Sequence, residues 1–328
     1  MTQVTRLRIV FLGTPEFAVP TLEALIAQPN LAVVAVVTQP DRPAGRGQKI
    51  HVPPSKSVAL EHNIPVLQPE SLARAPEIVE MLRVLNPDLI VMVAFGQILK
   101  KAVLQLPRLG VINLHASLLP AYRGAAPINW AIINGDRETG ITTMFTEAGV
   151  DTGPTLLKKF LPIDPDIDAE ALAKQMSSAG AKLIIETIEK LTTDGLKPER
   201  QDDSRATFAP ILTKELGNID WKHSASSIHN LVRGLIPWPG AATTFRGEIL
   251  KIWKTSTELP SGEFTAGQHD SLEPGSIIVD GKEVLVRCGN VATDALRLLV
   301  VQPVNRARMS AIDWINGARL KVGEGLGT

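Results

Sequence analysis

The chain has 328 residues, of which 44% are hydrophobic and 21% are charged, and its formal net charge is zero. This length exceeds one ordinary domain of about 100–200 residues, so we expect two domains. The balanced charge argues against a protein that coats nucleic acid nonspecifically, although a local basic patch can still contact one folded RNA. The single cysteine, Cys288, excludes an internal disulfide and a cysteine-rich zinc site, and its valine-rich surroundings predict a buried thiol.

The N-terminal apolar run, residues 9–13, is too short for a signal sequence. No apolar stretch approaches the roughly 18 residues that a membrane helix needs. We therefore expect a cytoplasmic protein without a membrane segment.

The first half of the sequence alternates short apolar runs with segments of helical periodicity. The apolar runs are rich in Val, Ile and Leu and cover residues 6–13, 31–38, 64–68, 88–95 and 110–115. Helical spacing covers residues 21–28, 55–62, 75–85 and 127–134. Continuous apolar strands that alternate with helices predict a parallel sheet covered on both faces, in a doubly wound, Rossmann-like arrangement. In such a sheet, ligands bind beyond the carboxyl ends of the strands.

The turn after the first strand argues against a dinucleotide cofactor. It reads Gly13-Thr14-Pro15 and lacks the G-x-G-x-x-G pattern. Pro15 also removes an amide that a phosphate cradle would use.

The second half of the sequence changes character after a long helix. Helical spacing over residues 168–191 gives one apolar stripe, made of Leu172, Met176, Leu183, Ile184, Ile188 and Leu191. The turn-rich, charged stretch 192–209 has no apolar period and is interpreted as a linker. A helix at 224–235 is then followed by short alternating strands at 241–246, 249–255, 275–281, 283–289 and 296–304. We expect residues 1–191 to form the catalytic domain and residues 210–328 a smaller antiparallel, OB-like β-barrel.

Polar residues end the strand predicted at 110–115. Asn113 and His115 are two residues apart, so their side chains point to one face of the strand. A later turn carries Asp151 between two glycines, which allow the chain to bend a carboxylate back toward a neighbouring strand end. An amide, an imidazole and a carboxylate suit acyl transfer to a nitrogen nucleophile, because the amide can stabilise an oxyanion and the imidazole can carry a proton. A single histidine near a strand end is more often structural. The residues around His115 are therefore needed to distinguish a catalytic histidine from a structural one.

A longer motif around His115 resembles a known superfamily. The string I-N-L-H-A-S-L-L-P-A-Y-R-G-A-A-P, with G-V-D-T-G downstream, closely resembles the catalytic segment of the 10-formyltetrahydrofolate-dependent formyltransferases. The segments Q-P-D-R-P-A-G-R-G-Q-K at 39–49 and I-P-W-P-G-A at 236–241 resemble the branch whose members formylate methionyl-tRNA for translation initiation. The resemblance extends from residue 11 to residue 319 and covers almost the whole chain.

The resemblance implies roles for individual residues. Asn113 would polarise the formyl oxygen, His115 would move a proton from the attacking α-amine toward N10 of the folate, and Asp151 would orient His115. The folate-binding residues that it implies are Ser117, Leu118, Leu119, Pro120, Phe95, Gln97, Leu99 and Glu147. 10-Formyltetrahydrofolate would be a consumed cosubstrate, with no permanently bound cofactor.

The same resemblance implies a tRNA-binding loop. The insertion after the second strand carries Arg42, Arg46 and Lys49, and guanidinium groups bind phosphates and stack on bases. Taken alone, such a loop is usually a solvated surface. The C-terminal barrel carries four further cations near its end, which are Arg306, Arg308, Arg319 and Lys321.

Two other functions remain open at this point. One is a formyltransferase that acts on an amino-sugar nucleotide or on glycinamide ribonucleotide with the same three residues. The other is a non-catalytic RNA-binding protein with the same fold. We expect a monomer, and no metal, because the remaining histidines lack metal-ligand spacing.

Overall fold

The computed structural model describes residues 6–44, 49–193, 195–259, 272–291, 293–321 and 323–327. The chain divides into two compact units. Unit 1 comprises Met1–Pro127, Thr139–Pro162 and Ala173–Ala209, and unit 2 comprises Ile128–Glu138, Ile163–Leu172 and Pro210–Thr328. Residues 128–138 and 163–172, which lie within the predicted catalytic domain, thus belong to unit 2. The described part of the predicted linker, residues 192–209, belongs to unit 1.

A seven-stranded sheet in the order β10-β9-β7-β6-β1-β2-β5 forms the centre of unit 1. Its strands are β1 (Leu7–Gly13), β2 (Leu31–Val37), β5 (Val66–Leu67), β6 (Leu89–Val93), β7 (Val111–His115), β9 (Glu138–Phe145) and β10 (Thr155–Pro162). The first five of these are parallel, whereas β9 pairs antiparallel with β7. The predicted doubly wound parallel sheet is confirmed in these five strands, and the antiparallel pairing of β9 is an addition that the sequence pattern did not reveal.

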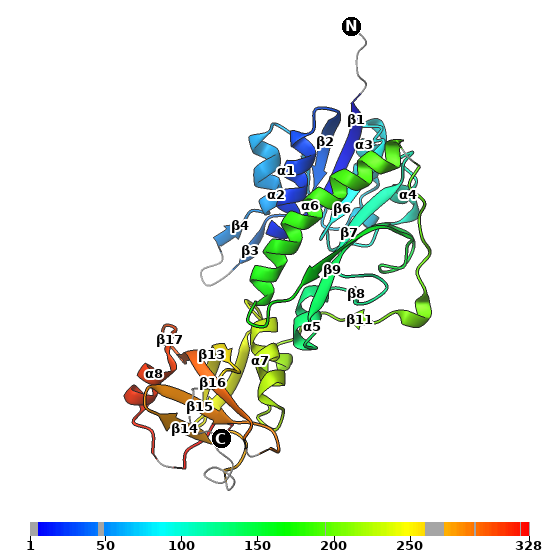
Figure 1. Cartoon of the computed structure of the whole chain (residues 1–328). Coiled ribbons are helices and arrows are strands. Elements are labelled where there is room, and N and C mark those ends of the chain that lie inside the picture. Colours follow the sequence, from blue (N-terminus) through cyan, green and yellow to red (C-terminus); the bar gives the residue numbers. More distant parts are fainter. Residues whose placement is uncertain are drawn as a thin grey trace. The chain divides into compact units, whose positions relative to one another are not determined.

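Helices cover both faces of this sheet. They are α1 (Val19–Ala27), α2 (Pro54–Glu61), α3 (Pro76–Val84), α4 (Lys101–Leu104) and α6 (Ala169–Thr193), with short 3-10 turns at Glu16–Ala18, Leu72–Arg74 and Asp203–Arg205. On one face, Leu12 of β1 and Ile90 of β6 belong to the same buried cluster as Leu82 of α3. On the other face, α6 crosses the sheet (Figure 1), so close to β7 that a Cβ atom on Gly180 would collide with the Leu114 side chain. The predicted helix 168–191 corresponds to α6, and all but Leu191 of its predicted apolar stripe is buried.

Two short strand pairs lie outside the main sheet of unit 1. β3 (Arg42–Ala44) and β4 (Lys49–His51) form an antiparallel pair, with Arg42 opposite His51. β8 (Arg123–Gly124) pairs in parallel with β11 (Phe208–Ala209), which is part of the stretch predicted as a linker.

Unit 2 is built on an antiparallel sheet with neighbours in the order β12-β13-β16-β15-β14, and β17 pairs with β16. Its elements are α5 (Pro127–Ile133), a 3-10 turn at Glu215–Gly217, α7 (Ala225–Gly234), β12 (Ala241–Phe245), β13 (Glu248–Ser256), β14 (Ile277–Asp280), β15 (Glu283–Arg287), β16 (Ala295–Pro303), β17 (Met309–Ser310) and α8 (Ala311–Ala318). The predicted antiparallel C-terminal domain is confirmed. Cys288 lies in its core, and burial raises the pKa of the Cys288 thiol to about 12, as expected for an inert cysteine.

Two side chains of α7 bind the backbone of the segment before α6, residues 163–168, which belongs to unit 2. His229 is buried, with Nε2 3.1 Å from the Pro165 carbonyl and Nδ1 2.9 Å from the Thr255 hydroxyl. Arg233 donates to the Ile167 carbonyl at 2.9 Å. Burial lowers the pKa of His229, because the charged ring would lose its hydration. None of the helices in the described ranges is long and apolar enough to cross a membrane.

Candidate active site

The site is built at the carboxyl end of β7, where apolar residues give way to polar ones. All five residues of β7 are buried, because the strand lies between β6 and β9. In the strand register, Asn113 pairs with Met92 of β6 and with Met144 of β9. Directly paired residues point to the same face of a sheet, and these three side chains line one cavity of about 100 Å³.

Asn113 is only 7% exposed, yet it lines this cavity. Within the described part of the chain, its amide makes no hydrogen bond to another protein group. The amide is therefore available to donate to an oxygen of a bound molecule.

His115 follows on the same face of the strand and is 6% exposed. Its Nε2 lies 2.9 Å from the Tyr122 carbonyl oxygen, and its Nδ1 lies 3.5 Å from Oδ2 of Asp151. A carbonyl oxygen can only accept, so Nε2 carries a hydrogen and donates it to Tyr122. With a second hydrogen on Nδ1, the ring can donate to both the Tyr122 carbonyl and the Asp151 carboxylate. A neutral ring can donate to only one of these two oxygens.

The carboxylate of Asp151 is held by an unusual turn. Asp151 has a φ angle of +54°, in the left-handed region, and Gly149 has a φ angle of +146°. The backbone N–H of Gly124 donates to Asp151 Oδ2 at 2.9 Å. Gly153 passes so close to the Phe145 carbonyl that any side chain would collide with it, which is why this turn needs a glycine there. The turn thereby brings Asp151 to the lining of the same cavity as Asn113.

Three of the predicted folate-binding residues line this cavity, namely Gln97, Leu99 and Glu147. The Gln97 side chain also accepts a hydrogen bond from the Leu72 backbone N–H at 2.6 Å, which fixes it to the chain that follows β5. Phe95 is buried in the core, and its carbonyl accepts a hydrogen bond from Gln39 Nε2 at 3.1 Å.

The other predicted folate segment, Ser117 to Pro120, is not part of the cavity lining. The side chains of Ser117 and Leu119 are buried, and those of Leu118 and Pro120 are half-buried. The Ser117 hydroxyl donates to the Ala121 carbonyl at 2.5 Å, and Lys158 Nζ donates to the Leu119 carbonyl at 2.7 Å. These bonds fix the loop that follows His115.

The predicted tRNA loop is described only in part. Arg42 is exposed on β3, whereas Arg46 and the side chain of Lys49 lie outside the described residues. Hydrogen bonds fasten the base of the β3–β4 hairpin: Lys56 Nζ donates to Asp41 at 2.7 Å, and Gln68 Nε2 donates to Asp41 at 2.8 Å. The hydrogen bonds from Gln68 and then from Lys56 lower the pKa of Asp41, so this anchor stays charged at neutral pH.

Two groups at the site escape sequence reasoning. One is the backbone carbonyl of Tyr122, which accepts from His115 and has no signature in residue type. The other is Gln201, whose side chain bonds to the turn of Asp151 from within the stretch predicted as a linker. That stretch has no apolar period, so nothing in it indicated a packed residue.

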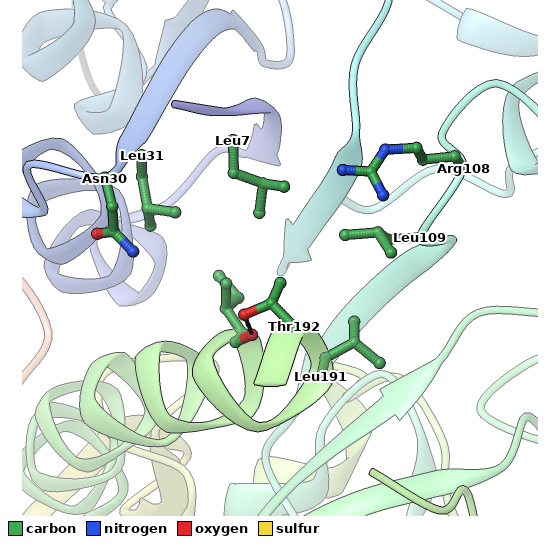
Figure 2. Close-up of a pocket in the computed structure, with 8 residues that line it drawn as sticks. Leu7, Asn30, Leu31, Arg108, Leu109, Leu191 and Thr192 are labelled. Carbon is green, nitrogen blue, oxygen red and sulfur yellow. Dashed lines mark hydrogen bonds between the residues drawn. The ribbon is translucent and has the colours of Figure 1, made fainter. Parts of the chain in front are cut away.

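A larger pocket of about 330 Å³ lies at the opposite edge of the sheet (Figure 2). Leu7 and Leu31 are the first residues of β1 and β2, so this pocket is at the amino ends of the strands. The rest of its lining is Asn30, Arg108, Leu109, Ile188, Leu191 and Thr192. Ligands of parallel sheets bind at the carboxyl edge, and this pocket contains none of the predicted site residues.

Two family models match most of the chain. Residues 7–188 match the family described as formyl transferase, and residues 211–319 match the formyl transferase C-terminal domain. The chain belongs to the formyl transferase family. It is 52% identical over 322 residues to a methionyl-tRNA formyltransferase of Geobacter metallireducens, covering 98% of this chain and 99% of that relative. It is 48% identical over 318 residues to the protein of the same name from Caldanaerobacter subterraneus, covering 97% and 99%. The resemblance predicted from the sequence motifs is confirmed.

Solved structures support the fold. WlaRD, a sugar 3N-formyl transferase crystallised with dTDP and 5-N-formyl-THF, matches with a TM-score of 0.63 and 18% identity, over 92% of this chain and 99% of that chain. HypX from Aquifex aeolicus in complex with tetrahydrofolic acid matches with a TM-score of 0.60 and 16% identity, over 95% of this chain and 47% of that chain. Identities this low bear on the fold alone.

Proposed function

We propose that this chain transfers the formyl group of 10-formyltetrahydrofolate to the α-amine of methionyl-tRNA, giving N-formylmethionyl-tRNA for translation initiation. Relatives with this name match it at 48–52% identity over nearly the whole chain. The observation that carries the proposal is the convergence of three groups: Asn113 and Asp151 line one cavity, and His115 lies 3.5 Å from Asp151.

In this proposal, each side chain has one task. The α-amine attacks the formyl carbon, a C–N bond forms, and the formyl oxygen becomes an oxyanion that accepts a hydrogen bond from the Asn113 amide. The His115–Asp151 pair takes the proton that the amine loses, and the negative Asp151 stabilises the cationic ring. As the bond between the formyl carbon and N10 breaks, the same proton passes to N10. The Tyr122 carbonyl holds the ring through Nε2 during both transfers.

In this proposal, the folate places its formyl group in the cavity lined by Asn113 and Asp151. A cavity of about 100 Å³ is smaller than the roughly 300–1,000 Å³ of pockets that enclose a whole drug-sized ligand, so it would hold only the reacting end of the folate. Gln97, Leu99 and Glu147 would contact that end, and Phe95 would support it from the core. The segment Ser117, Leu118, Leu119 and Pro120 would act through the position that it gives to His115 and to the loop after it. The folate is a cosubstrate, and no resident cofactor takes part.

In this proposal, cationic side chains on both units bind the tRNA. In unit 1, Arg42 on the hairpin β3–β4, together with Arg46 and Lys49, contacts the acceptor end. In unit 2, the second group of cations is Arg308 and Lys251, beside Trp253. The Arg308 guanidinium lies 3.5 Å from the centre of the Trp253 ring, and Lys251 Nζ lies 5.5 Å from it. Cations stacked on an aromatic ring are held in place while their charge stays available to phosphates. A monomeric protein in the cytoplasm, where charged tRNA is made, completes the proposal.

An acceptor competition tests this function. The purified chain is given 10-formyltetrahydrofolate with a labelled formyl group and equal concentrations of methionyl-tRNA, glycinamide ribonucleotide and a dTDP-linked amino sugar. We expect the label in methionyl-tRNA. Label in either small acceptor would overturn the choice of acceptor, and tRNA binding without any transfer would leave only an RNA-binding protein.

A further inference from the structure

The side chain of Gln201 makes four hydrogen bonds beside the proposed catalytic residues. Its Nε2 donates to the carbonyl oxygens of Asp151 at 2.8 Å and of Gly153 at 2.7 Å. Its Oε1 accepts from Nε of Arg123 at 3.1 Å and from Nη2 of Arg123 at 2.9 Å. Both hydrogens of the amide group and its oxygen are therefore used, and all of these contacts lie within unit 1.

The backbone register places Gln201 opposite this turn. Thr155 and Glu199 form an antiparallel bridge with two backbone hydrogen bonds of 2.8 Å. Because the two segments run antiparallel, the residue two positions before Thr155 lies opposite the residue two positions after Glu199. Gly153 therefore lies opposite Gln201. This isolated bridge thus places residues 199–201 alongside residues 153–155, next to the turn that carries Asp151.

The neighbours of Gln201 decide which way its amide faces. Arg123 is 5% exposed and its guanidinium can only donate, so it fixes the amide oxygen on its own side. The NH₂ group is thereby directed at two carbonyls that can only accept. The residue after Arg123, Gly124, donates its backbone N–H to the Asp151 carboxylate. The 151–153 turn is consequently held at its backbone by Gln201 and at its carboxylate by Gly124.

We propose that Gln201 is a positioning residue for formyl transfer, which fixes the 151–153 turn so that the Asp151 carboxylate faces the His115 ring. The turn needs such support, because Asp151 adopts a positive φ angle that L residues rarely choose. Without the two donors, the carboxylate can rotate away from Nδ1 of His115, and misplacement by about 1 Å costs up to about 100-fold in rate. This inference rests on the proposed function, because it assigns Gln201 an effect only through Asp151.

The variant Gln201→Glu tests this directly. It keeps the shape of the side chain and the acceptor for Arg123, but it replaces both donors with an oxygen that faces two carbonyl oxygens. We expect kcat for formyl transfer to methionyl-tRNA to fall by about 10- to 100-fold, with unchanged tRNA affinity. The pH profile of kcat should match that of Asp151→Asn rather than that of the wild type. In the Asp151→Asn background, Gln201→Glu should change kcat less than about twofold, because the two residues act as one unit.

The matched control is Asp203→Ala. Asp203 Oδ1 accepts from Arg123 Nη2 at 2.7 Å, so this variant removes the other partner of the same guanidinium without touching the turn. Its carboxylate is 82% exposed, and we expect kcat within twofold of the wild type. Gln201→Met, which removes the donors without adding a charge, should reproduce the loss in kcat if Gln201→Glu fails to fold.

The outcomes separate this inference from the proposed function. A wild-type kcat in both Gln201 variants, a wild-type pH profile at reduced kcat, or full multiplicative loss in the double variant would each overturn the role of Gln201. If Asp151→Asn itself leaves kcat unchanged, the catalytic assignment fails, and the role of Gln201 fails with it.

Discussion

The substitution Asp151→Asn removes one charge and preserves the shape of the side chain. Its amide oxygen can still accept the Gly124 N–H, so the turn keeps this support. What is lost is the negative charge 3.5 Å from Nδ1 of His115. At that distance and an effective dielectric constant of about 20, the attraction between the carboxylate and a protonated ring is about 5 kcal/mol.

Both side chains are largely buried, so salt screens this attraction only weakly. The amide dipole of Asn and entering water would replace part of it. We therefore expect kcat to fall by about 10²–10³, since each 1.36 kcal/mol is worth tenfold in rate. The measurement is single-turnover transfer of labelled formyl to methionyl-tRNA, with thermal unfolding as the control for folding. A correctly folded variant with kcat within threefold of the wild type would refute the role of Asp151.

Three other expectations follow from the described contacts. Asn113→Ala removes the amide that faces the cavity, and kcat in the same assay should fall by about 10²–10³, equivalent to roughly 2.7–4 kcal/mol; a loss below fivefold would contradict oxyanion stabilisation by Asn113. Arg42→Ala should raise KM for methionyl-tRNA about tenfold while KM for the folate stays constant; an equal rise in both would mark the hairpin as purely structural. The lowered pKa of His229 means that the folded chain binds fewer protons than the unfolded chain, so stability is lost as the pH falls below about 6.5. Urea midpoints measured from about pH 7.5 to 5.5 should decline in the wild type and decline less in His229→Gln, and a flat wild-type profile would show that the ring is not buried in its neutral form.

Much of the fold was predictable because strands of a parallel sheet are buried on both faces and so appear as continuous apolar runs. The spacing of Asn113 and His115 likewise placed both on one face of a strand, since side chains alternate along a strand. The antiparallel pairing of β9 was not predictable, because the residue pattern of a strand does not reveal the direction in which it pairs. Its consequence is large, since β9 provides Met144 beside Asn113 and leads into the turn of Asp151.

The placement of Asp151 came from the resemblance and not from spacing. A carboxylate beside glycine fits any turn, and the direction of this one depends on contacts that are distant in sequence. The amide of Gln201 bonds to a turn about fifty residues earlier in the chain and to Arg123 earlier still. Such bonds depend on tertiary packing, which no local pattern encodes.

The convergence of Asn113, His115 and Asp151 is tested most directly by formyl transfer in His115→Ala, measured in parallel with tRNA binding and folate binding. We expect turnover to fall by about 10²–10⁴ while both affinities remain close to those of the wild type. Turnover equal to that of the wild type, in a variant shown to be folded, would contradict a mechanism that moves the proton through this ring.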